Sequence, residues 1–221
     1  MNGMLAEVRF LLAKDLSLEL KLKHTLGSII LFASSTIFVC YLSFLNIVGK
    51  FTWNALFWII LLFAATNTIS RSFREEGDDR FLYYYFVARP QSFILAKAIY
   101  NCMITLLIAM LSLGLYLMVM GNPVQDMSLF LVAVLLGVIG LAIPLTMVAA
   151  IAAKAGNNPV MMSILSFPIV LPVLLNCIKM SRVAIDDLGA AFSYDEIGTL
   201  LAIDAIAIVL SLILFPYLWK N

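Results

Sequence analysis

The sequence predicts an all-α integral membrane protein, with six transmembrane helices and an N-terminal helix at the membrane interface. The first observation is composition. The 221 residues are 63% hydrophobic and 12% charged, whereas soluble domains are about 45–50% apolar and about 25% charged. The second observation is that the apolar residues lie in long runs. The mean hydropathy of the whole chain is +1.05. A helix needs about 20 such residues to cross the hydrocarbon core. The net charge of +1 argues against nucleic acid as a partner.

Residues 1–25 mix charged and apolar side chains and form the predicted interfacial helix. An apolar residue recurs every three or four positions, at Leu5, Val8, Leu12 and Leu16. This spacing places one apolar stripe along a helix, although Asp15 and Glu19 intrude on its edge. We expect the helix to lie at the cytoplasmic surface of the membrane. The alternative is a cytosolic extension of the first span.

Six apolar segments follow, and with the interfacial helix they make one transmembrane domain, residues 1–221. The predicted spans cover residues 26–47, 53–69, 93–120, 127–153, 160–178 and 197–219. Trp53 and Trp58 open the second span, and Trp219 closes the sixth. Aromatic rings at such positions are expected to meet the lipid headgroups.

Four polar side chains fall inside or near the ends of these spans. Lys97 lies near the cytoplasmic start of the third span, where we expect it to extend its ammonium group to the surface. Asn67 and Asn101 are expected to bond between the second and third spans. Asp204 lies near the outer end of the sixth span. It is either a functional carboxylate, which is the default for a charge inside a membrane, or a side chain that reaches water.

The Lys and Arg residues predict the orientation of the chain. Three of the fourteen, at Lys50, Lys179 and Arg182, fall on one side of a six-span arrangement, and the other eleven fall on the opposite side. Cytoplasmic loops carry the excess of Lys and Arg. Both termini and the segment before the third span are therefore expected in the cytoplasm.

Residues 70–92 are the one dense polar stretch between two apolar runs, and we interpret them as a cytoplasmic coupling loop. The residues expected to contact a soluble, energy-supplying partner are Phe73, Arg74, Glu75, Glu76, Asp78, Asp79, Arg80, Tyr83, Tyr84, Tyr85, Arg89 and Pro90. The carboxylates suit basic residues of a partner, and tyrosine rings are typical anchors of protein interfaces. The alternative is a solvated loop whose tyrosines rest on headgroups.

No pattern in the chain indicates catalysis. The sequence has no phosphate-binding glycine loop, no HExxH motif and no nucleophile elbow. A hydrolase inside the membrane would need paired catalytic groups, and Asp204 is the one carboxylate deep in a span. We expect a non-catalytic subunit that depends on ATP hydrolysis by another chain.

Four motifs occur in order along the chain: Phe73-Arg74-Glu75-Glu76, then Arg89-Pro90, then Ile94-Leu95-Ala96-Lys97, and later the paired prolines of Ser166–Pro172. Together these motifs resemble the CcmB family. The resemblance extends over the whole chain in length and in the position of the loop. One departure is the stretch Asp78–Tyr83, which stands where the family has a Gly-Thr-Leu-Glu centre.

The resemblance implies an ABC-2-type permease-like fold and a role in cytochrome c maturation at the bacterial cytoplasmic (inner) membrane. Such a permease subunit would couple ATP hydrolysis by a partner to haem export or delivery, or to release of the haem-loaded chaperone. The implied partners are an ABC ATPase subunit, a WWD-type haem-handling membrane subunit, a small single-span subunit, a periplasmic haem chaperone and a second copy of this chain. No cofactor would bind this chain directly, since ATP belongs to the ATPase and haem is handled by the complex.

Two other functions remain open from the sequence. One is an ABC-2-type exporter of another substrate, for which a wide polar or aromatic channel would be expected, whereas these spans are mostly aliphatic. The other is a scaffold subunit that transports nothing and only holds its partners together.

Overall fold

Seven helices make up the described part of the protein. The computed structural model describes residues 2–21, 23–44, 48–74, 89–154, 159–186 and 194–220, and the regular secondary structure in these ranges is entirely α-helical. The helices are α1 (Asn2–Lys21), α2 (Lys23–Phe44), α3 (Lys50–Arg74), α5 (Pro90–Met120), α6 (Met127–Lys154), α7 (Pro159–Asp186) and α8 (Tyr194–Lys220). The predicted all-α class is confirmed.

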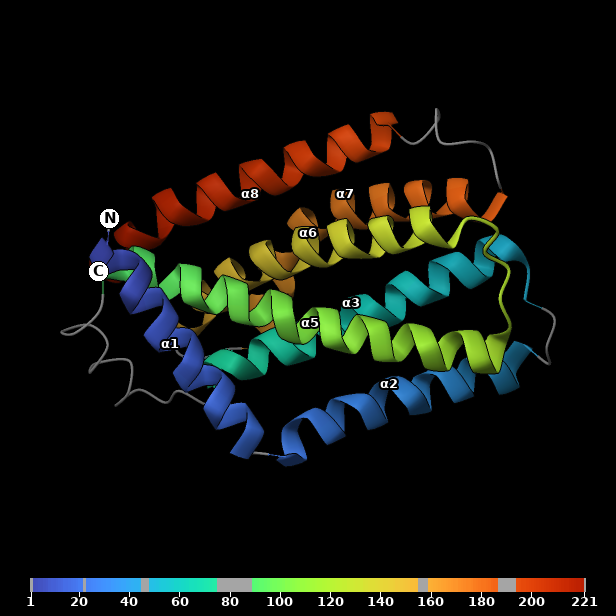
Figure 1. The fold of residues 1–221 in the computed structure, drawn as a ribbon, viewed down its shortest axis with the longest axis horizontal. Helices are drawn as coiled ribbons and strands as arrows, with labels where there is room; N and C mark the ends of the chain where they lie inside the picture. The colour runs from blue at the N-terminus through green and yellow to red at the C-terminus, as the bar shows by residue number, and fades with distance from the viewer. Residues whose placement is uncertain are drawn as a thin grey trace.

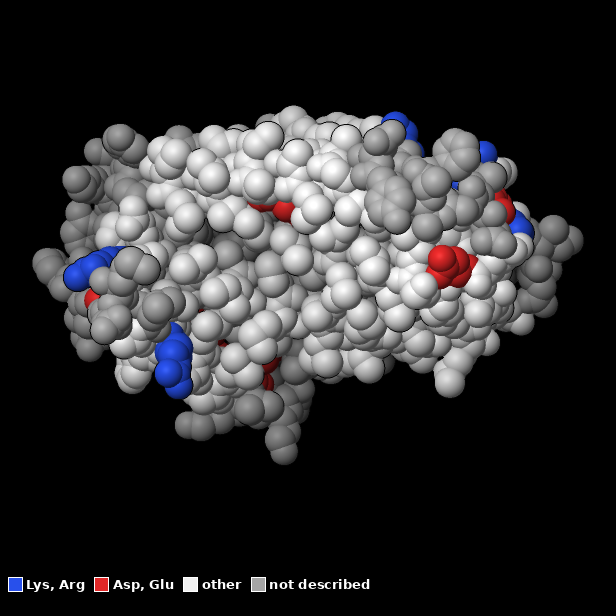
Figure 2. Space-filling view, turned by 45° about the horizontal axis from the view of Figure 1, so that its top comes forward, with Lys and Arg blue, Asp and Glu red and all other residues white. Residues whose placement is uncertain are grey.

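The six longest helices run along the long axis of the molecule, and α1 crosses one end of the bundle (Figure 1). Five helices contain segments long and apolar enough to cross a membrane: Gly27–Phe44, Lys50–Arg74, Pro90–Met120, Met127–Lys154 and Ile164–Asp186. The apolar part of α8, Ile197–Ile213, is shorter. On the face drawn in Figure 2, charged side chains lie toward the two ends and the band between them is nearly all uncharged. The chain is a multi-pass membrane protein.

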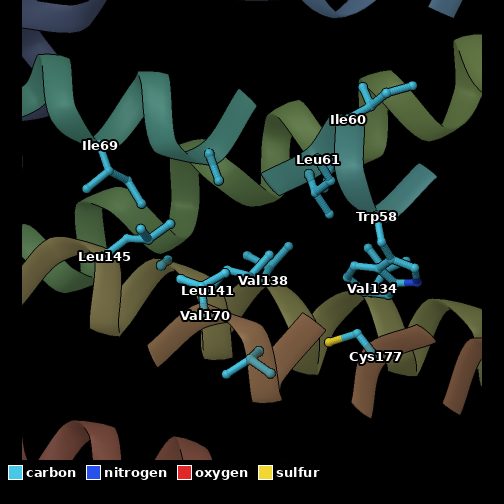
Figure 3. Close-up of a cluster of buried hydrophobic side chains, with 14 of the residues drawn as sticks. Trp58, Ile60, Leu61, Ile69, Val134, Val138, Leu141, Leu145, Val170 and Cys177 are labelled. Carbon is cyan, nitrogen blue, oxygen red and sulfur yellow. The ribbon is translucent and has the colours of Figure 1, made fainter. Parts of the chain in front are cut away.

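Helix α6 forms the centre of the bundle because small residues let its neighbours approach closely. A side chain at Gly137 would collide with the Trp58 ring of α3 and come within 2.8 Å of the Cys177 sulfur of α7. Figure 3 shows Trp58, Cys177 and the α6 residues Val134 and Val138 in one cluster. Close backbone approach through small residues is a common way to pack helices in lipid, where the hydrophobic effect between helices is weak.

The prediction that Trp53 and Trp58 meet the headgroups is wrong. Their exposed fractions are 1% and 0%, so both rings lie inside the protein. The Trp58 Nε1 donates a hydrogen bond of 2.8 Å to the Ser181 Oγ of α7, and Trp53 packs its ring 4.8 Å from that of Tyr116 on α5. Hydropathy cannot separate an interfacial tryptophan from one that packs on, or bonds to, another helix.

The helices extend into the segment 70–92 that we predicted as a loop. α3 continues to Arg74, and α5 begins at Pro90. Pro90 suits the first turn of a helix, where its missing N–H is not needed, and the Phe93 N–H bonds to the Arg89 carbonyl at 3.0 Å. Residues 75–88 lie outside the described residues.

The opposite end of the bundle is closed by polar caps and ion pairs. α7 runs to Asp186, past the predicted limit at 178, and the Asp186 carboxylate lies 3.5 Å from the Arg182 Nε and 3.9 Å from the Lys50 Nζ. Asp126 precedes α6 and accepts hydrogen bonds from the Ser128 hydroxyl at 2.6 Å and the Leu129 N–H at 3.0 Å. These bonds, the Ser128 bond first, hold the pKa of Asp126 below its usual value. Such capping satisfies N–H groups that the helix itself leaves unpaired.

Candidate functional site

The candidate site lies where α3 ends, α5 begins and α1 crosses the bundle (Figure 1). Of the residues predicted to contact a partner, the structure describes Phe73, Arg74, Arg89 and Pro90; the others, Glu75, Glu76, Asp78, Asp79, Arg80, Tyr83, Tyr84 and Tyr85, lie outside the described residues. Arg74 and Arg89 are exposed, whereas Phe73 is buried in the last turn of α3. Of the described residues in the predicted contact set, Phe73 therefore packs inside the junction and does not face a partner.

A buried ion pair joins α1 to α5 directly beside this junction. The Lys97 Nζ lies 3.2 Å from the Asp15 Oδ2, and the two side chains are 4% and 7% exposed. The same ammonium donates a hydrogen bond of 3.3 Å to the Ser72 carbonyl of α3. It also lies 5.7 Å from the centroid of the Phe73 ring and 5.6 Å from that of Tyr100, within the range of a cation–π contact. Lys97 thus connects three helices.

The expectation that Lys97 extends to the membrane surface is wrong. A buried charge is tolerated when a counter-charge and hydrogen bonds surround it, and α1 supplies the counter-charge. The sequence already contained a sign that Lys97 has a buried partner, because Asp15 and Glu19 interrupt the apolar stripe of α1. A carboxylate on the apolar face of a helix indicates a buried cation or donor opposite it.

Further polar contacts between α1 and α5 flank the ion pair on both sides. The Tyr100 hydroxyl donates to the Glu19 Oε2 at 2.6 Å, and the Arg89 Nε lies 3.8 Å from the Glu7 Oε1. The partners follow the same order along both helices. Between them lies a small apolar cluster, formed by Val8, Leu11, Leu12, Leu95 and Ala96.

These contacts make α1, the last turn of α3 and the first turns of α5 a single packed unit. Because Lys97 bonds to both α1 and α3, a displacement of the α3–α5 junction must move α1 or break a buried ion pair. Removing one partner of such a pair costs about 3–5 kcal/mol. The arrangement is therefore suited to passing a mechanical displacement between the junction and the transmembrane helices.

Asn101 lies deeper in α5 and bonds to a different helix from the one expected. Its Nδ2 donates to the Thr146 Oγ1 of α6 at 2.9 Å, and Thr146 in turn donates to the Ala142 carbonyl at 2.6 Å. Asn67 is exposed on α3, so the predicted pairing of Asn67 with Asn101 does not form. The sequence predicted that Asn101 bonds to another helix, but it did not identify α6 as the helix that supplies the partner.

Asp204 is 4% exposed and does not reach water in this structure. Its carboxylate lies against Gly140 of α6, where a side chain would come within 2.6 Å of the Asp204 Oδ1. Neither carboxylate oxygen has a hydrogen-bond partner in the described part of the chain. The interfacial alternative for this residue therefore does not hold.

Comparison with known proteins identifies the family of this chain. The family model for CcmB protein matches residues 6–218. Neither a curated protein nor a solved structure matches the chain. The matched range includes the α1–α5 contacts, the α3–α5 junction and Asp204, and it covers nearly the whole sequence. The chain belongs to the CcmB family.

Proposed function

We propose that this chain receives an ABC ATPase at the α3–α5 junction and passes the ATPase movement to its transmembrane helices through α1 and Lys97. Membership of the CcmB family makes it a permease subunit of the haem-exporting ABC transporter of cytochrome c maturation, a class of subunit that is generally non-catalytic. The observation that carries the mechanical part is the buried Asp15–Lys97 ion pair beside the junction.

The sequence between the ends of the two helices supplies the docking chemistry. Asp78, Asp79 and the neighbouring tyrosines stand between Arg74 at the end of α3 and Pro90 at the start of α5. Carboxylates in such a segment would pair with basic residues of the ATPase, and the rings would supply apolar contact area. Because the helices on both sides of this segment, α3 and α5, pack together with α1, we expect a force on the segment to act on all three helices.

Several features support six spans with both termini in the cytoplasm. α8 lies alongside the five helices whose apolar segments are longer than its own. It ends at the same end of the bundle at which α1 begins (Figure 1). The α3–α5 junction lies at that end too, in agreement with the distribution of Lys and Arg. We further propose that α1 lies in the interface, because Phe10 is 75% exposed and Arg9 is exposed beside it. An exposed ring next to a basic residue is typical of a helix resting on headgroups.

The wider partner set completes the proposal. It comprises a WWD-type haem-handling membrane subunit, a small single-span subunit, a periplasmic haem chaperone and a second copy of this chain, assembled in the bacterial inner membrane. Energy from the ATPase would drive haem export or delivery, or release of the loaded chaperone. ATP would bind the ATPase alone, and haem would be handled by the complex rather than held by this chain.

The docking step is tested by the triple variant Asp78→Ala, Asp79→Ala and Tyr84→Ala, expressed with the other subunits of the complex. We expect the ATPase to co-purify several-fold less and to lose its stimulation by the membrane subunits. The matched control is Asp186→Ala, which removes a carboxylate at the opposite end of the bundle. If the triple variant retains the ATPase and its stimulation, docking at this junction is disproved.

A second measurement separates the transporter from a scaffold. An ATPase variant that binds but does not hydrolyse ATP should abolish cytochrome c maturation if movement of this chain matters. Normal maturation with that variant would favour the scaffold function. Maturation unaffected by loss of this chain would favour export of another substrate.

A further inference from the structure

Asp204 occupies a space that exists only because α6 has no side chain at the facing position. A Cβ added at Gly140 would come within 2.6 Å of the Asp204 Oδ1 and 2.9 Å of the Val173 Cγ1 of α7. α6, α7 and α8 therefore enclose the carboxyl group. Both of its oxygens are buried and have no hydrogen-bond partner among the described residues.

Among the described residues, the helices packed around Asp204 offer it no counter-charge. The titratable groups near it are the thiols of Cys102 on α5 and Cys177 on α7. The charged residues of these helices lie toward their ends: Lys97 on α5, Lys154 on α6, and Lys179, Arg182 and Asp186 on α7. Lys97 is paired with Asp15, and Arg182 with Asp186.

The neighbouring cavity is also unsuited to hydrating a charge. About 270 Å³ of space lies between α5, α6 and α8, lined among others by Cys102, Ile143 and Ser211. Its walls are almost wholly apolar, and it opens to the outside of the bundle, where Ile99, Met103 and Ile208 are exposed. An ionised carboxylate with neither cation, donor nor water is strongly disfavoured in the membrane interior, and a group so placed takes up a proton instead.

We infer that Asp204 is a proton-binding site, and that in this conformation it is a neutral carboxylic acid packed on the bare backbone of Gly140. The site is separate from ATPase docking.

Infrared spectroscopy of the full-length chain in lipid nanodiscs tests the site without any partner subunit. The protein carries isotope-labelled aspartate and is measured at about pH 6, where ordinary aspartates, with a pKa of about 3.9, are already ionised. We expect one protonated-carboxyl C=O band from aspartate, and its complete loss in Asp204→Asn. Absence of that band in the wild-type protein, or its persistence in Asp204→Asn, overturns the inference.

A pair of glycine variants tests the placement of the carboxyl group. Gly140→Ala puts a methyl group where the Asp204 carboxyl lies, so the acid band should shift or give way to carboxylate bands. Gly114→Ala adds the same methyl group to α5 where nothing lies within 4 Å, and it should leave the band unchanged. An identical acid band in Gly140→Ala would refute the packing of Asp204 on Gly140.

Discussion

Neutralising Asp15 is the sharpest perturbation of the proposed coupling unit. Asp15→Asn keeps the size of the side chain but removes the counter-charge of Lys97, whose ammonium lies 3.2 Å away in a site where both side chains are nearly fully buried. Lys97→Met removes the other charge and keeps most of the aliphatic stem. The double variant removes both charges and leaves neither group buried alone.

The structure sets the expected size of each effect. Breaking a buried ion pair costs about 3–5 kcal/mol of unfolding free energy, and we expect Asp15→Asn near the lower end because Lys97 retains the Ser72 carbonyl at 3.3 Å. Lys97→Met should cost less, about 1–3 kcal/mol, since Asp15 retains Lys14, which lies 2.9 Å away and is 23% exposed. The double variant should recover to within about 1 kcal/mol of wild type, because replacing both partners of a buried pair is often nearly neutral.

The assay is a double-mutant cycle on the purified chain, unfolded in mixed detergent micelles. A coupling energy of about 3–6 kcal/mol is expected, because the two single-variant costs together exceed the cost of the double variant by that amount. In the assembled complex, Asp15→Asn should retain the ATPase but lose its coupling to cytochrome c maturation. If the two single-variant costs simply add, the ion pair does not hold α1 to α5 and the coupling unit is refuted.

Two further predictions follow from other parts of the structure. Ser181→Ala removes the acceptor of the Trp58 Nε1–H and the donor to the Asn54 Oδ1, both at 2.8 Å. It should therefore cost about 1–3 kcal/mol of unfolding free energy and alter the Trp58 fluorescence; unchanged stability would mean that the bonds do not form. Reporter fusions after Lys220 and within residues 121–125 should report opposite sides of the membrane, because α6, α7 and α8 would separate the two points; the same side for both would refute the six-span topology.

The sequence by itself determined the class of the protein, its family and the place of its main polar segment. Long apolar runs have few stable solutions in lipid, because every backbone polar group must be satisfied within the helix. The predicted third span begins at residue 93, whereas α5 begins at Pro90, which we had assigned to the loop. The motifs around Phe73 and Arg89 indicated the family, and the match over residues 6–218 confirmed it.

Only the tertiary structure decided which polar groups meet. The sequence placed Lys97 and Trp58 at the membrane surface, and for Asp204 it left a functional carboxylate and a water-exposed side chain both open. Their actual surroundings come from helices far away in the sequence: α1 pairs Lys97, α7 bonds Trp58, and a glycine of α6 makes room for Asp204. Helical periodicity fixes the face on which a side chain lies, but the occupant of the opposite face depends on how all the helices pack together.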